Sequence, residues 1–187
     1  FHLDQGHPGF PVERLRSWLE AEDYPHAIER EDTYSIVTEK IPEGQTPCSL
    51  CSRLRRAILY DAARRHGCNK VALGHHRDDL VVTLMLNLLY SGMLATMPPK
   101  LRNDDGDIQV IRPLAWVAEE AIVAFSGEAG FPIIPCTLCG RGVDLKRARM
   151  GRLLTDLERE IPDVRRSIMA AMSNVRPSHL MDRGIFD

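Results

Sequence analysis

The sequence lacks long apolar runs. Its longest apolar-rich stretch, LVVTLMLNLLY at Leu80–Tyr90, is interrupted by Thr83 and Asn87. It is also shorter than the roughly 18 apolar residues of a membrane span. The stretch therefore predicts a buried helix. The first residues show no signal-peptide pattern, so we expect a cytoplasmic protein without a membrane partner.

The chain also lacks a strong net charge, low-complexity tracts and internal repeats beyond a recurring cysteine pair. A net charge of −2, with 44% hydrophobic and 27% charged residues among 187, is ordinary for one soluble globular domain. Overall charge therefore gives no sign of nucleic-acid binding. Basic residues nevertheless cluster at 53–65 and at 141–152. Such clusters either bind phosphate backbones or form solvated helix faces.

Four of the five cysteines form two pairs of one pattern, PCSLC with Cys48 and Cys51 and PCTLC with Cys136 and Cys139. In a reducing cytosol such pairs indicate metal or redox chemistry more often than disulfides. Their spacing is compatible with a four-thiolate zinc site, a dithiol redox pair or an iron–sulfur cluster. The fifth, Cys68, is expected to be a small buried side chain.

Strand-like and helix-like patterns alternate along the chain. Helical spacing predicts helices at 11–22, 49–66, 78–90, 118–130, 144–160 and 162–174, with Gly67 ending the second. Extended segments are predicted at 1–4, 27–32, 34–37, 70–74 and 108–114. This alternation is typical of an α/β fold in which helices cover both faces of a parallel sheet.

KVALG (Lys70–Gly74) has the composition of a buried parallel strand, and GHHRDD (Gly74–Asp79) lies directly at its end. Ligands of parallel sheets sit beyond the carboxyl ends of strands. Asp78 or Asp79 is suited to cap the next helix, and together they are suited to bind Mg²⁺ beside a phosphate. A cap needs only one aspartate, so we favour a ligand site.

Several stretches together resemble the tRNA 2-thiocytidine synthetases, which are cluster-dependent members of the PP-loop ATP pyrophosphatase superfamily. They are PCSLCSRLRRAILY, KVALGHHRDDLVVTLMLNLLYSG, MPPKL, IRPL, FPIIPCTLCG and NVRPSHLMD. The resemblance begins at HLDQGHPGFP and covers nearly the whole chain. It implies a Rossmann-like adenine-nucleotide-binding domain with a helical C-terminal segment.

The resemblance also implies a reaction and its partners. ATP, with Mg²⁺, adenylates the 2-oxo group of cytidine 32 in the tRNA anticodon loop, and sulfur then displaces AMP. Magnesium and cationic groups would offset the triphosphate charge, and a base in a single-stranded loop can be splayed out for reaction. A sulfur donor such as a cysteine desulfurase and a homodimer are further expectations.

The resemblance assigns roles to individual residues. Cys48 and Cys51 would hold a [4Fe–4S] cluster, with a third ligand from the second pair, Cys139 rather than Cys136. Three ligands would leave one iron open to carry the sulfur. Cofactor binding would involve Gly74, His75, Asp78 and Asp79, with one of the two aspartates binding Mg²⁺ or acting in catalysis. Arg53, Arg55 and Arg56 would place positive charge beside the cluster, or beside tRNA and ATP phosphates.

One departure from the superfamily is large. Its phosphate-binding loop, SGGxDS, is not found in these residues, and the resemblance places it before Phe1. We therefore expect residues 1–135 to form a partial PP-loop domain, on which a C-terminal segment at 136–187 packs. By themselves the 187 residues would bind ATP poorly and would not thiolate tRNA.

Two other functions remain possible from the sequence. The first is a non-catalytic, zinc-stabilised α/β module that binds RNA through its basic helices. The second is another PP-loop enzyme, either an amidotransferase-type ligase or a thiolase acting on a different tRNA base. The paired cysteines argue against the ligase.

Overall fold

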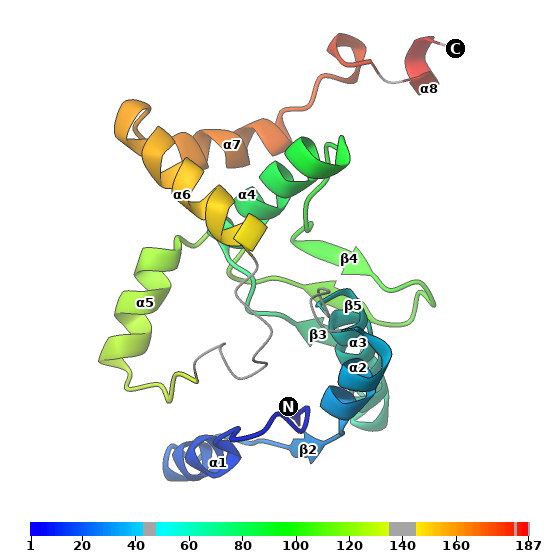
Figure 1. Cartoon of the computed structure of the whole chain (residues 1–187), viewed down its shortest axis with the longest axis vertical. Coiled ribbons are helices and arrows are strands. Elements are labelled where there is room, and N and C mark those ends of the chain that lie inside the picture. Colours follow the sequence, from blue (N-terminus) through cyan, green and yellow to red (C-terminus); the bar gives the residue numbers. More distant parts are fainter. Residues whose placement is uncertain (43–47, 135–144, 182, 187) are drawn as a thin grey trace. The chain divides into compact units, whose positions relative to one another are not determined.

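The computed structural model describes residues 1–42, 48–134, 145–181 and 183–186. The chain divides into two compact units (Figure 1). Unit 1 comprises Phe1–Leu73, Pro99–Arg112 and Glu120–Asp144, and unit 2 comprises Gly74–Pro98, Pro113–Glu119 and Leu145–Asp187. The expected boundary between residues 135 and 136 lies outside the described residues, so that division stays a prediction. Within the described ranges, no helix is long and apolar enough to cross a membrane.

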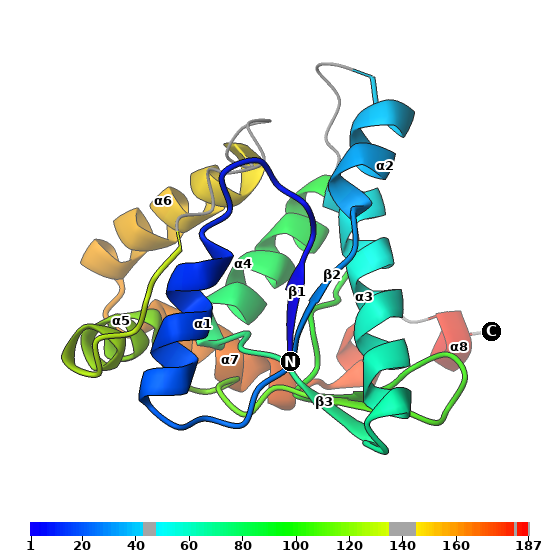
Figure 2. The ribbon, with the colours of Figure 1, turned by 90° about the horizontal axis from the view of Figure 1, so that it is seen from below.

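The strands described in unit 1 form two small sheets. β1 (His2–Asp4) pairs in parallel with β2 (Ile28–Arg30), and the two run side by side in Figure 2. In the second sheet β5 (Gln109–Ile111) is central. It pairs in parallel with β3 (Lys70–Ala72) and antiparallel with β4 (Lys100–Arg102). The parallel pairings confirm the predicted sheet type, whereas β4 was not predicted.

The prediction that KVALG is a buried strand was wrong, although its parallel pairing was right. Lys70 and Ala72 of β3 are exposed and Val71 is only partly buried. β3 is exposed because it lies at an edge of its sheet among the described strands. Burial is concentrated at the central strand instead, where Val110 and the preceding Ile108 are almost fully buried.

The helices described in unit 1 are α1 (Val12–Ala21), α2 (Thr33–Lys40), α3 (Cys48–Arg65) and most of α5 (Glu119–Glu128). In the view of Figure 2, β1 and β2 lie between α1 and α3. α1, α3 and α5 agree with the predicted helices within a few residues. Helices and parallel strands together give the expected α/β architecture.

The segment 34–37 was predicted to be extended, but it lies within α2. The Asp32 carboxylate accepts the Ser35 backbone N–H at 3.0 Å and the Ser35 hydroxyl at 2.7 Å. These bonds satisfy an N–H group that an isolated helix start would leave without a partner. They also lower the pKa of Asp32. A capped helix start therefore outweighs the strand preference of the β-branched residues that follow.

The expectation of a buried Cys68 was also wrong, because its side chain is exposed. Gly67 has a φ of +66° and ends α3 as predicted. The Cys68 backbone N–H then donates to the Ala63 carbonyl at 2.8 Å. Cys68 thus belongs to the capped end of a surface helix rather than to the core.

Unit 2 is helical in its described part. Its main elements are α4 (Arg77–Leu86), which continues as the π-turn η1 (Asn87–Ser91), α6 (Leu145–Glu160) and α7 (Val164–Ser173). A short 3-10 turn, η3 (Pro177–His179), and α8 (Arg183–Phe186) follow. α4 packs against both α6 and α7. The two predicted C-terminal helices and their separation near Pro162 are confirmed.

A small apolar core holds these helices together. Val81 and Val82 of α4 meet Met150 and Leu154 of α6, and all four side chains are buried. Ile168 of α7 packs against this cluster. Fully burying one such side chain contributes about 1.5–3 kcal/mol. The core therefore fixes α6 against the first turns of α4, which carry the predicted ligand residues.

Candidate functional site

The described cysteine pair lies on the first turn of α3. Cys48 is exposed and Cys51 is partly buried. Residues three apart on a helix are neighbours on one face, so α3 presents both thiols on the same side. The other predicted ligands, Cys136 and Cys139, lie outside the described residues.

Cys51 lies against two nitrogen donors from different elements. The Gln5 side-chain amide donates to the Cys51 Sγ at 3.2 Å, and Arg55 Nη2 donates to the same sulfur at 3.6 Å. Gln5 directly follows β1 in the sequence, whereas Arg55 lies one turn beyond Cys51 on α3. A sulfur that receives two N–H donors, one of them cationic, is suited to carry the negative charge of a metal-bound thiolate.

The arginines that follow the cysteines have different surroundings. Arg55 Nε also donates to Gln5 Oε1 at 2.6 Å, so this side chain is directed toward the cysteine site. Arg53, Arg55 and Arg56 are all exposed, so the three differ in their contacts rather than in their burial. For the two described cysteines, a contact from these arginines is given by Arg55, which reaches Cys51.

The described residues alone do not complete a metal site. No group of three or more histidine, cysteine, aspartate or glutamate side chains gathers within the described ranges. The pair on α3 supplies two sulfur ligands, which suits a cluster or a zinc ion only with further ligands from elsewhere. The choice between zinc and iron–sulfur therefore depends on residues beyond these two.

The GHHRDD motif forms the turn that leads into α4 in unit 2. Gly74 is exposed, and a Cβ atom added there would meet no described atom within 4 Å. His75 is partly buried. The backbone at this turn therefore has open space beside it, as a ligand that approaches the main chain requires.

Asp78 is the more buried of the two aspartates, with 9% of its side chain exposed. Its Oδ1 lies 3.0 Å from Arg165 Nε of α7 and 3.2 Å from Arg77 Nη2. Its Oδ2 accepts the Glu119 backbone N–H at 2.9 Å. Arg165 in turn pairs with Glu158 at 2.7 Å. Both oxygens of Asp78 are thus occupied by contacts that join α4 to neighbouring segments.

Asp79 is more open, with 24% of its side chain exposed. Its Oδ2 accepts the His76 backbone N–H at 3.2 Å, which caps α4 as the alternative interpretation predicted. The same oxygen lies 3.3 Å from His76 Nε2. Its Oδ1 pairs with Arg147 Nη2 of α6 at 2.6 Å, and the Arg147 side chain is 41% exposed. Asp79 therefore faces a cation that also reaches solvent.

Three residues of these two sites were not predicted from the sequence. Gln5 directly follows a predicted strand, so the rule that ligands gather at strand ends could have identified it. Arg147 and Arg165 lie on helices far along the chain. Their spacing in the sequence gives no signal that they reach Asp79 and Asp78.

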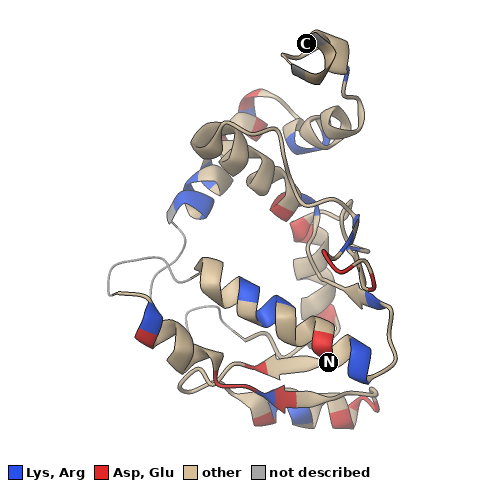
Figure 3. Cartoon of the chain, turned by 90° about the vertical axis from the view of Figure 1, so that its right-hand side faces the viewer, with Lys and Arg blue, Asp and Glu red and all other residues tan. Residues whose placement is uncertain are grey.

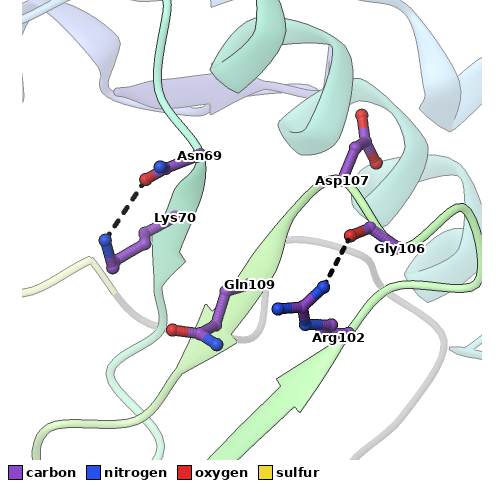
Figure 4. Close-up of a pocket in the computed structure, with 6 residues that line it drawn as sticks. All are labelled: Asn69, Lys70, Arg102, Gly106, Asp107 and Gln109. Atoms are coloured by element: carbon purple, nitrogen blue, oxygen red, sulfur yellow. Dashed lines mark hydrogen bonds between the residues drawn. The ribbon is translucent and has the colours of Figure 1, made fainter.

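A separate polar hollow lies on the second sheet of unit 1 (Figure 4). It measures about 260 Å³ and is lined by Asn69, Lys70, Arg102, Gly106, Asp107 and Gln109. Lys70 donates to the Asn69 side chain, and Arg102 to the Gly106 carbonyl. The Asp107 carboxylate is bound by Arg64, which together with Asn103 lowers its pKa. The charged side chains that line the hollow therefore have protein partners.

Basic and acidic segments alternate along the ribbon in Figure 3. This distribution agrees with the net charge of −2.

The chain was compared with family models, with curated proteins and with solved structures. No protein-family model matches the chain. The tRNA-cytidine(32) 2-sulfurtransferase of Sorangium cellulosum is 56% identical over 185 residues, which are 99% of this chain and 65% of the relative. The protein of the same name from Hyphomonas neptunium is 55% identical over 186 residues, covering 100% of this chain and 63% of the relative. The chain thus spans a little under two thirds of these relatives' length.

Among solved structures, the U34-tRNA thiolase NcsA from Methanococcus maripaludis with its [4Fe–4S] cluster has a similar fold. The TM-score is 0.71 with 19% sequence identity, over 95% of this chain and 60% of that chain. At this identity the likeness shows a shared fold. It confirms the predicted α/β fold class.

Proposed function

We propose that this chain, as a member of the tRNA-cytidine(32) 2-sulfurtransferase family, takes part in the ATP-dependent replacement of the 2-oxo group of cytidine 32 in tRNA by sulfur. The observation that carries the proposal is 56% identity across 99% of the chain. Because the chain spans 65% of that relative, we propose for it a share of the reaction, made up of a cluster site and a nucleotide site.

The cluster site is built on α3. Cys48 and Cys51 would be two ligands of a [4Fe–4S] cluster, with Cys139 the preferred third ligand and Cys136 the alternative. When bound, the cluster would supply an open iron position for the sulfur that is transferred. The two N–H donors at Cys51 support this assignment, because such donors stabilise metal-bound thiolates.

The nucleotide site lies at the start of α4. Of the two aspartates, Asp79 is the better candidate for Mg²⁺, because its carboxylate is partly exposed and meets a half-exposed arginine. Asp78 would be a structural anchor, since both of its oxygens are already bound by groups held in the fold. Gly74 and His75 are proposed to lie beside the nucleotide, and a Cβ added at Gly74 would meet no described atom within 4 Å.

Arg147 would change partner when Mg²⁺ and ATP bind. Arg147 occupies the Asp79 carboxylate in the structure, and its guanidinium would be repelled by a cation bound there. The side chain can then turn to the phosphates, which arginine binds through two N–H groups. The SGGxDS loop, which would hold the rest of the triphosphate, is not found in these 187 residues.

The remaining partners follow from the reaction. The exposed Arg53 and Arg56 are candidates to contact the tRNA backbone, because phosphate contacts supply much of RNA-binding affinity. A sulfur donor such as a cysteine desulfurase would reload the cluster site. We propose action in the cytoplasm as a homodimer.

The first test is metal and sulfide analysis of the chain after anaerobic purification and cluster reconstitution. About four iron and four sulfide per chain are expected for a [4Fe–4S] cluster. The Cys48→Ala and Cys51→Ala variants should not retain it. One zinc without sulfide, unchanged after reconstitution, would favour the zinc-stabilised RNA-binding module instead.

The second test is nucleoside analysis of tRNA. The chain is joined to the SGGxDS-containing segment of a curated relative and expressed in cells without 2-thiocytidine. Mass spectrometry of the digested tRNA should then detect 2-thiocytidine, and an Asp79→Asn variant should not restore it. A thiolated uridine without 2-thiocytidine would identify a thiolase that acts on another base.

A further inference from the structure

The side chain of Gln5 forms hydrogen bonds with three other side chains at the cysteine site. It is buried, with 7% of the residue exposed. Its amide nitrogen donates to Thr33 Oγ1 at 3.1 Å and to Cys51 Sγ at 3.2 Å. Its amide oxygen accepts Arg55 Nε at 2.6 Å. All its side-chain polar atoms are therefore bonded.

The orientation of this amide follows from its partners. Arg55 Nε is only a donor, so the oxygen of Gln5 must face it, and the amide nitrogen must face Thr33 and Cys51. A hydroxyl oxygen and a sulfur both accept hydrogen bonds. With this orientation of the amide, an N–H group of Gln5 points at the Cys51 sulfur and all three partners are bonded.

The backbone around Gln5 is fixed as firmly as its side chain. The Gln5 carbonyl accepts the Tyr34 backbone N–H of α2 at 3.0 Å. The next residue, Gly6, has a φ of +78°, and its N–H donates to the Asp4 carboxylate at 2.9 Å. A Cβ at Gly6 would lie 2.9 Å from the carboxylate oxygen of Asp32. This close approach of the chain to the capped start of α2 places Gln5 opposite α3.

The guanidinium of Arg55 completes the arrangement. It reaches Cys51 directly at 3.6 Å and reaches it again through the oxygen of Gln5. Its positive charge also helps to lower the pKa of His7, after the larger effect of burial. All three arginines of α3 are exposed; Arg55 differs from Arg53 and Arg56 in that its guanidinium bonds to Cys51 and Gln5.

We infer that Gln5 and Arg55 are positioning residues of the cluster site, which act through Cys51 and set the electron density on its sulfur. The inference rests on the proposed cluster. Hydrogen bonds and positive charge at a ligand sulfur stabilise the more negative, reduced state of an iron–sulfur cluster and raise its reduction potential. They also hold the thiolate in one orientation, which slows loss of the cluster.

The test measures the midpoint potential of the reconstituted chain by anaerobic spectroelectrochemistry. Gln5→Glu keeps the size of the side chain and the acceptor for Arg55, but it replaces the N–H donor at Cys51 with a negative charge. We expect its potential to become more negative. With the solution poised at the wild-type midpoint, the ratio of oxidised to reduced cluster should rise about tenfold, which is ~59 mV for one electron.

Two further variants and a control separate this effect from simple damage. Gln5→Met and Arg55→Met each remove donors without adding negative charge, and both should shift the potential in the same direction by a smaller amount. Chelation of iron by bathophenanthroline should be several-fold faster in both. Arg53→Met removes an exposed charge from the same helix and should leave the potential and the chelation rate unchanged.

The possible results separate the role of Gln5 and Arg55 from the presence of the cluster itself. A cluster that is present in all variants at the wild-type potential would overturn the inference and leave the proposed function standing. Equal shifts in Arg53→Met and Arg55→Met would also overturn it, because general charge would then explain the result. If no variant and no wild-type sample takes up a cluster, the proposed function fails, and the inference fails with it.

Discussion

The two adjacent aspartates of the α4 turn should behave differently when each is changed to asparagine. Asp78→Asn removes the charge that Arg165 meets at 3.0 Å and Arg77 meets at 3.2 Å. The Arg165 side chain is 14% exposed and that of Asp78 is 9% exposed, so the pair is largely buried. Breaking a buried pair by removing one partner costs roughly 3–5 kcal/mol.

Asparagine keeps the shape of aspartate and one acceptor oxygen, and Arg165 keeps its contact with Glu158. We therefore expect the lower end, ~3 kcal/mol lost from the free energy of unfolding. For a protein of this size a change of 1 kcal/mol shifts Tm by about 2–4 °C, so Tm should fall by ~6–12 °C. Asp79→Asn breaks a partly exposed pair and should cost only about 1 kcal/mol.

Urea denaturation followed by circular dichroism measures both values. Hydrogen exchange should show the loss of protection in α4, α6 and α7, the helices that pack together in unit 2. Binding of Mn²⁺ with ATP is measured by electron paramagnetic resonance on the chain joined to the SGGxDS-containing segment. It should be lost in Asp79→Asn and retained in folded Asp78→Asn. Equal destabilisation by both changes, or metal binding lost only in Asp78→Asn, would refute the separate roles.

Three other predictions concern the supports of the two sites. Leu154→Ala removes a fully buried side chain between α4 and α6, and the free energy of unfolding should fall by ~3 kcal/mol in urea denaturation. Gly6→Ala places a Cβ at a φ of +78° and 2.9 Å from the Asp32 carboxylate. The free energy of unfolding should fall by ~2 kcal/mol, and the cluster should be lost faster. A Tm equal to that of the wild type would contradict this prediction. Burial lowers the pKa of His2 and, with a contribution from Arg55, that of His7 below 6.5. Below pH 6.5 the unfolded chain therefore binds more protons than the folded chain. The stability that the two neutral imidazoles contribute is complete above pH 6.5 and decreases as pH falls below it. His7→Gln should reduce the slope of Tm against pH between 7.5 and 5.

Much of the local structure could be predicted from the sequence, because it depends on neighbours in the chain. The apolar spacing of α3 and its end at Gly67 are local signals, as is the GHHRDD motif at the start of α4. The predicted helix began at Ser49, so the sequence did not place Cys48 on the first turn of α3. The wrong prediction at 34–37 shows the limit of such signals. There the deciding interaction was the Asp32 cap, which a strand-like composition concealed.

Sequence alone determined which residue types carry the chemistry: two thiols three residues apart, and two carboxylates beyond a parallel strand. Only the tertiary structure decided how they differ from one another. It brings Gln5 to Cys51, Arg165 to Asp78 and Arg147 to Asp79. The physical reason is that these partners are set by the packing of whole elements, such as the core that fixes α6 on α4. No spacing within a single segment encodes such contacts, and it is these contacts that distinguish an anchoring aspartate from one open to a metal.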